Sequence, residues 1–263
     1  MAAARGWRGW CIFCAPRGYG VAALAGAVFY SMPSLLIKAL GLALAALLLA
    51  TPGRAQTAPP VVLENPAAQR AITEALFRPV GRQAPASATL PFRRDPAVRR
   101  QAEALTVRQV RATNEAAGEQ LAQLFASRDV LAAWGQAMQA YGLTLDNVAD
   151  ALTANWLVLY LSANQIAEPP PAAQVAALRR QVRRVCALPS LAGKLKTGAQ
   201  RQQLADYLHL QSLLLNQAQS GAEAAHDAAA GATLAERARQ VARQNMGFDP
   251  TTVTLTAKGL ARK

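Results

Sequence analysis

The stretch "LTLDNVADALTANWLVLYLSANQ", residues 143–165, decides the fold class of this 263-residue chain. Its second half, "WLVLYL" at 156–161, is apolar on every face of a helix, and such a helix has to be enclosed by other elements. We expect Thr144 to cap its N-terminus, with Leu143 and Val148 in the two positions of a hydrophobic staple. The segment therefore predicts a central helix that is surrounded by others.

Helical patterns continue on both sides of this segment. Further helices are expected in "RRDPAVRRQAEALTVRQV", "GEQLAQLFAS", "RDVLAAWGQAMQAYG" and "AAQVAALRRQVRRVCAL", from about Ala199 onward, and around "GATLAERARQVARQNMG". No alternation of strands with helices is present, so the class is all-α. We predict an irregular helical bundle of about five to seven helices with a Pro-rich N-terminal arm.

Capping residues place several helix ends. Asp95 is a natural N-cap because Pro96, which lacks only an N–H that has no partner there, suits the first helical position. Gly142 is a natural C-terminal stop for the helix before the central one. The last helix is expected to begin with a capping box at Thr233–Glu236 and to end at Gly247.

The N-terminal region reads as an export signal. From Met32 the chain has a short basic start, an apolar core at 39–50 and small residues before a cleavage site after Ala55, so residues 32–55 are predicted to be a signal peptide. Residues 1–31 then form an upstream extension that results from a mis-assigned start. These features place the protein in the periplasm or outside the cell.

An alternative interpretation keeps the first Met. Residues 21–50 then become an uncleaved anchor in the inner membrane, since a spanning helix needs ~20 apolar residues. Ser31, Ser34 and Lys38 interrupt that run. Either interpretation exports the rest of the chain.

Three further segments follow the predicted cleavage site. Residues 56–94 are rich in Pro and are expected to form a linker or arm, with one short helix at 66–78. Residues 95–247 form the helical domain, and residues 248–263 a C-terminal tail with a short extended piece. The 208 residues after residue 55 are enough for one domain with a core of its own.

The charge of the chain suggests an anionic partner, and its cysteine content suggests no thiol chemistry. The chain carries 28 basic and 15 acidic residues; five of the basic ones precede residue 56, which leaves 23 against 15, a net charge of +8. A positive protein outside the cytoplasm attracts anionic lipids or acidic polymers. Only Cys186 lies after residue 56, and its helical position predicts a buried, inert thiol.

The strongest candidate binding surface is a cluster of four arginines, Arg179, Arg180, Arg183 and Arg184, in one predicted helix. Guanidinium groups on adjoining helix faces concentrate positive potential and bind phosphates or carboxylates in a forked geometry. A solvated face that neighbouring acidic residues neutralise is the competing interpretation.

Catalytic patterns are weak. Asp146 and Asp150 lie four apart on one helix, where capping and solvation account for both, and His209 is expected to face solvent. The nucleophile, metal and phosphate-loop signatures that we sought are missing from the sequence, so we expect no metal and no cofactor. The aromatic side chains Trp134, Tyr141, Trp156 and Tyr160 are expected to pack in the core.

Two resemblances bear on function. "YGLTLDNVADALTANW" resembles the start of a helix-turn-helix, but the apolar residues that follow cannot read base edges, so nucleic acid is not an expected partner. Together with "RQQLADYLHLQSLLL" and "MGFDPTTVTLTAKGL", the same region resembles a family of uncharacterised exported bacterial proteins with an all-helical domain of unknown function. That resemblance covers roughly residues 90–260 and implies export and an all-α domain.

The sequence favours a non-enzymatic binding or structural module of the cell envelope. Its expected partner is an anionic envelope component or another envelope protein, and contact with a membrane is expected only if residues 21–50 remain as an anchor. One alternative is a hydrolase that uses Asp146, Asp150 or His209 in a helical cleft. A second alternative is a periplasmic chaperone or adaptor, which would need a large apolar groove.

Overall fold

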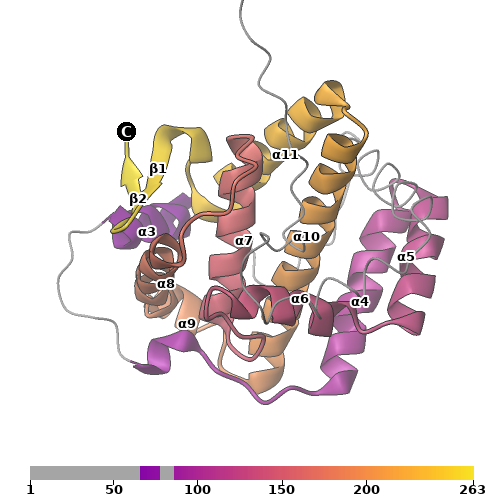
Figure 1. The fold of residues 1–263 in the computed structure, drawn as a ribbon. Helices are drawn as coiled ribbons and strands as arrows, with labels where there is room; N and C mark the ends of the chain where they lie inside the picture. The colour runs from indigo at the N-terminus through magenta and orange to yellow at the C-terminus, as the bar shows by residue number, and fades with distance from the viewer. Residues whose placement is uncertain (1–65, 78–85) are drawn as a thin grey trace, which may run out of the picture.

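A computed structural model describes residues 66–77 and 86–263 (Figure 1). The predicted upstream extension, signal peptide, cleavage site and alternative anchor all lie outside the described residues. Within them, no helix combines the length and the hydropathy that crossing a bilayer requires.

Nine α-helices make up most of the described chain, which confirms the all-α class. Their number exceeds the five to seven expected, partly because short helices such as the four-residue α9 are included. The α-helices are α3 (Pro66–Phe77), α4 (Pro96–Arg111), α5 (Glu115–Ser127), α6 (Val130–Gln139), α7 (Val148–Ala163), α8 (Ala172–Cys186), α9 (Pro189–Ala192), α10 (Gly198–Ala224) and α11 (Ala228–Met246). Two 3-10 helices, η1 (Ala86–Thr89) and η2 (Pro250–Thr252), and two strands, β1 (Val253–Thr256) and β2 (Gly259–Arg262), complete the fold.

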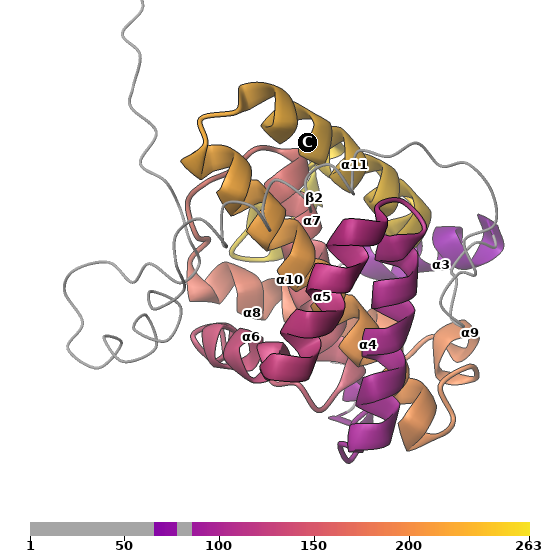
Figure 2. The same cartoon turned by 90° about the vertical axis from the view of Figure 1, so that its right-hand side faces the viewer.

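Helix α7 is the centre of the molecule, as its sequence predicts. All 16 of its residues are buried, and α8, α10 and α11 pack around it (Figure 1). On the far side of α10, α4 and α5 form an antiparallel pair (Figure 2). Trp134 and Trp156 are fully buried, which confirms that these two aromatic residues belong to the core.

The start of α7 differs from the prediction. Asn147, not Thr144, is the N-cap, and its side chain accepts a hydrogen bond of 2.8 Å from the backbone N–H of Asp150. Thr144 lies one turn earlier, where its backbone N–H donates to the Asp150 carboxylate. Both residue types cap helices well, so the sequence alone does not decide between them.

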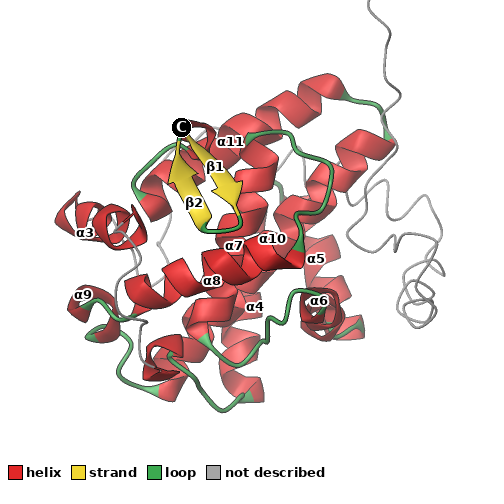
Figure 3. Cartoon of the chain, turned by 60° about the vertical axis from the view of Figure 1, so that its left-hand side comes forward, coloured by secondary structure: helices red, strands yellow, loops and turns green. Residues whose placement is uncertain are grey.

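The Pro-rich arm contributes to the core. Helix α3 confirms the short helix expected there, but Ile72 and Leu76 are buried against α8, α11 and β2 (Figure 3). Residues 66–77 of the predicted linker or arm therefore pack against the helical domain. An isolated α3 would expose apolar side chains on two successive turns, so packing this short helix against the domain is favourable.

The predicted C-terminal tail also joins the core. Strands β1 and β2 form an antiparallel hairpin in which Val253 pairs with Arg262 and Thr256 with Gly259. Val253 and Leu260 are buried beside α8. The piece expected to be extended is thus a strand, but it belongs to a packed hairpin rather than to a tail.

Gln181 of α8 joins the hairpin to α3. Its amide group donates to the carbonyl oxygens of Leu76 (3.2 Å) and Leu260 (2.9 Å), and its Oε1 accepts from the backbone N–H of Leu260 (2.7 Å). Gly259 makes this approach possible, because a Cβ there would lie 2.3 Å from Oε1 of Gln181. Its φ of +102° is also one that favours glycine.

Helix α11 begins earlier than predicted. Asp227 is the N-cap, with its carboxylate accepting from the backbone N–H of Ala230 at 2.9 Å. The expected capping box at Thr233–Glu236 is therefore wrong, and the Thr233 hydroxyl instead donates to the Ala229 carbonyl oxygen inside the helix. The predicted end is confirmed, since Gly247 is in the left-handed conformation with a φ of +79°.

We expect Gln181→Leu to destabilise the fold by ~3 kcal/mol, because it leaves the buried N–H and C=O of Leu260 without partners. Unfolding in urea measures the change. Gln174→Leu, at a half-buried position of the same helix, is the matched control and should change the stability by less than ~0.5 kcal/mol. Equal effects of the two substitutions would contradict the role given to Gln181.

Candidate functional site

The four predicted binding arginines have different surroundings in the structure. Arg179 forms a two-point ion pair with Asp150, with Nε 2.5 Å from Oδ1 and Nη2 2.8 Å from Oδ2. The Asp150 side chain is fully buried, whereas that of Arg179 is 32% exposed. Arg179 therefore joins α8 to the first turn of α7 rather than facing a ligand with a free guanidinium.

The Asp150 carboxylate is surrounded by hydrogen-bond donors. Besides Arg179, its carboxylate accepts from the backbone N–H of Thr144 and from the Asn147 amide, both at 2.9 Å. The N-terminus of α7 adds a favourable dipole. Asp150 is thus a buried structural group and not the solvated one that we expected, whereas Asp146 is exposed and accepts from the Thr144 hydroxyl.

The other three arginines divide between interior and surface. Arg184 is half-buried and donates to the carbonyl oxygens of Ala75 (3.2 Å) and Leu76 (3.1 Å) near the end of α3, where a cation complements the helix dipole. Arg183 is half-buried and has an interaction of its own. Arg180 is exposed, so it is the member of the cluster best placed to meet a partner.

A second basic surface joins two segments that lie about a hundred residues apart in the chain. Arg201 of α10 donates from Nη1 to the Pro91 carbonyl oxygen (3.0 Å) and from Nε to the Leu195 carbonyl oxygen (2.8 Å). Gln202 and the backbone of Asp95 exchange two further hydrogen bonds, of 2.7 and 2.8 Å. The loop before α4 is thereby attached to the loop between α9 and α10.

We call this surface the basic end and define it by Arg93, Arg94, Lys194, Lys196 and Arg201. The first four side chains are exposed and Arg201 is half-buried. The loops that carry them lie at the lower end of the molecule in Figure 1, away from the hairpin. Sequence analysis missed this surface because no periodicity links the two loops; only the hydrogen bonds of Arg201 and Gln202 do.

His209 is in the interior. It is fully buried, and its Nδ1 accepts a hydrogen bond of 3.0 Å from the indole N–H of Trp134, so the expectation that it faces solvent is wrong. Helix α6 covers this side of α10 and carries Trp134. Burial, with a further contribution from the charge of Arg94, lowers the pKa of His209 to about 3.

Asp206 lies one turn before His209 and is also buried. Gln202 donates to its carboxylate at 3.0 Å, and burial raises the pKa of this carboxyl group above its usual value. Cys186 is fully buried too, and burial raises the pKa of its thiol to about 12, which confirms the inert thiol expected from the sequence. These groups lie in the packed interior.

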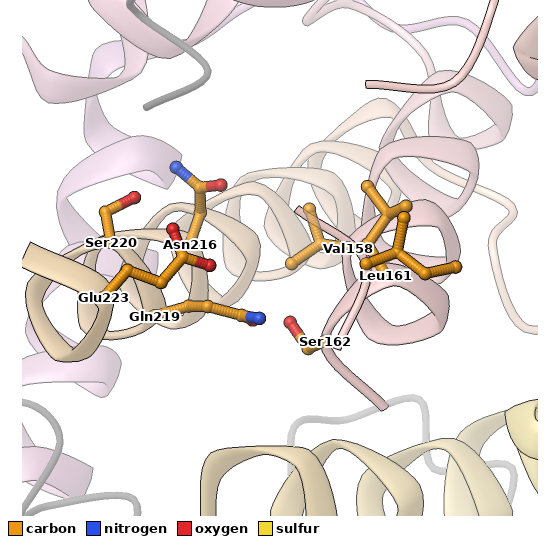
Figure 4. A pocket seen from close by; sticks show the side chains of 8 residues that line it. Val158, Leu161, Ser162, Asn216, Gln219, Ser220 and Glu223 are labelled. Carbon is orange, nitrogen blue, oxygen red and sulfur yellow. The ribbon is translucent and has the colours of Figure 1, made fainter. Parts of the chain in front are cut away.

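A small hollow lies between α7 and α10 (Figure 4). Ser162 and Gln219 point toward each other across it. Its other lining residues are Val158, Leu161, Ile166, Asn216, Ser220 and Glu223. A cavity volume of about 20 Å³ gives room for about one water molecule and not for an organic substrate.

Metal chemistry finds no support in the described ranges. In residues 66–77 and 86–263, no three His, Cys, Asp or Glu side chains come together in an arrangement that could hold a metal ion.

Comparisons with protein-family models, with curated proteins and with solved structures find no significant match to the chain. The family suggested by the sequence therefore stays a prediction, and the function has to be argued from the described residues.

Replacing Arg179 with Met should cost ~3 kcal/mol of stability, because the Asp150 carboxylate stays buried without its cationic partner. Thermal or urea unfolding measures the loss. Arg180→Met, one residue along the helix and exposed, is the control and should change the stability by less than ~0.5 kcal/mol. Adding Asp150→Asn to Arg179→Met should recover part of the loss; failure to recover any would contradict an electrostatic origin.

His209 should make the fold sensitive to acid. Because its folded pKa lies below its unfolded value, the unfolded state binds the proton first, and stability falls as the pH drops from about 6.5 toward 3. The expected slope is up to ~1.4 kcal/mol per pH unit. Urea unfolding at several pH values measures it, and His209→Gln should reduce the slope in this window.

The raised pKa of Asp206 changes the stability with pH in the opposite direction, since the folded state holds that proton more tightly. Asp206 is present in both wild type and His209→Gln, so its contribution cancels when their slopes are compared. The exposed His226 is the control: His226→Asn, which tolerates the left-handed backbone at this position, should keep the wild-type slope. An unchanged slope in His209→Gln would refute the assignment.

Proposed function

We propose that this chain is an exported, non-enzymatic binding module of the cell envelope whose ligand is an anionic component. The observation that carries the proposal is the positive charge at Arg180 and in the basic end. These side chains form no ion pair within the described part of the chain. Export rests on the signal-peptide pattern at 32–55. Long-range attraction by such charge favours an anionic partner.

Burial of the titratable groups supports binding over hydrolysis. A hydrolase would need Asp146, Asp150 or His209 beside a cleft that admits a substrate. Asp150 is instead enclosed by Arg179 and the first turn of α7, and His209 is enclosed beside Trp134, in a separate hydrogen-bond network. Neither group has the access to solvent that a general acid or base requires.

The chaperone alternative has less support as well. A surface that holds unfolded chains would be an apolar patch of more than a few hundred Å². The hollow between α7 and α10 has room for about one water molecule and is lined partly by polar residues. A folded module with a charged exterior fits these observations better.

Sedimentation with envelope fractions tests the proposal. The wild-type chain should bind at ~0.01 M ionic strength and bind more weakly at ~0.15 M, where the screening length is shorter. Arg180→Glu should weaken the binding, whereas Lys258→Glu, an exposed charge reversal in the hairpin turn, should change it less. Binding that is absent at low ionic strength, or that salt does not affect, would refute an electrostatic binding module.

A further inference from the structure

We infer that the basic end is the surface by which the protein docks onto an anionic phospholipid bilayer. This inference rests on the proposed function and names the ligand class and the residues. Its starting point is the way in which Arg201 and Gln202 attach two loops to each other, which gathers the five cationic side chains Arg93, Arg94, Lys194, Lys196 and Arg201.

The loop between α9 and α10 presents its lysines outward. Leu195 is fully buried and its carbonyl oxygen accepts from Arg201, whereas Lys194 and Lys196 on either side of it are exposed. Burial of Leu195 anchors the backbone of this loop between the two exposed lysines. The charges therefore belong to an anchored loop, which lowers the conformational entropy lost on binding.

The loop before α4 is anchored in the same way. The backbone N–H of Phe92 donates to the Asp146 carbonyl oxygen at 2.9 Å, and Asp95 is held through Gln202. Arg93 and Arg94 lie between these two fixed points and are exposed. The loop that carries both arginines lies at the same end of the molecule as the loop between α9 and α10 (Figure 1).

Acidic groups compensate the charge of the basic end only in part. The Asp95 carboxylate accepts from the backbone N–H of Ala97 as a helix cap, and Asp146 is exposed nearby. The charge of Arg94 also acts on the buried Asp206, where it offsets part of the rise in pKa that burial causes. Arg201 donates to carbonyl oxygens, which carry no net charge, so its positive charge remains.

The shape of the region favours a bilayer over other anions. A small phosphate is bound by donors that converge in a pocket, and a single-stranded polyanion is bound along a groove. Neither the hollow between α7 and α10 nor the one beside Phe77 and Arg262 is lined by a residue of the basic end. Charges spread over two loops instead match an array of lipid phosphates, to which each Lys or Arg adds its own attraction.

Vesicle co-sedimentation of the full chain tests the inference. One set of vesicles contains phosphatidylcholine alone, and the other also contains about one third phosphatidylglycerol. The difference in binding between the two sets isolates the electrostatic contribution to binding from any contribution of the apolar run at 21–50. The double variant Lys194→Gln/Lys196→Gln should bind the anionic vesicles about 30-fold more weakly than wild type. The control Arg108→Gln/Lys258→Gln removes two exposed charges outside the basic end and should bind within about threefold of wild type.

The outcomes separate the two proposals. Suppose that wild type binds envelope fractions but the lysine variant binds anionic vesicles as strongly as the control variant does. The inference of bilayer docking by the basic end is then wrong, and the proposed function stands. If wild type binds neither, the proposed function is wrong as well. Displacement from the vesicles by millimolar inorganic phosphate, or by soluble polyphosphate of equal phosphate content, would overturn the bilayer as ligand. Circular dichroism should show equal helix content in all variants.

Discussion

The ion pair between Asp150 and Arg179 joins the first turn of the central helix to the middle of α8, and the other packing of the molecule is arranged around that junction. Helix α7 has no face that tolerates water, so it needs neighbours on all sides. Its N-terminus carries a buried carboxylate, which is stable there only with a cation and hydrogen-bond donors around it. These two requirements together fix where α8 lies along α7.

Buried polar groups elsewhere act in a similar way. Gln181 satisfies backbone groups of both α3 and β2, and His209 accepts from Trp134 between α10 and α6. Each of these contacts specifies one arrangement of two elements, because a shifted register would leave a polar group unsatisfied in the core. The apolar residues supply most of the stabilisation, whereas the polar contacts select the arrangement.

Such use of polar groups also explains how the arginines are divided. Arg179 and Arg184 act within the fold, one at a carboxylate and one at the carbonyl oxygens near the end of α3. Among the described cationic side chains that form no ion pair are Arg180 and the five of the basic end. A count of arginines along one helix therefore overstates its binding surface, and the exposed charge of two distant loops becomes the stronger candidate for contact with an anion.

The sequence by itself determined the all-α class, the enclosure of α7, the cap at Asp95 and the helix end at Gly247, because helical periodicity and capping depend on residues within a few positions of one another. Only the tertiary structure decided that α3 and the C-terminal hairpin complete the core, that His209 and Asp150 are buried, and that Arg201 joins two loops into the basic end. Each of these depends on residues from elements distant in the chain, and the local pattern around His209 or Arg201 carries no information about which element packs against it.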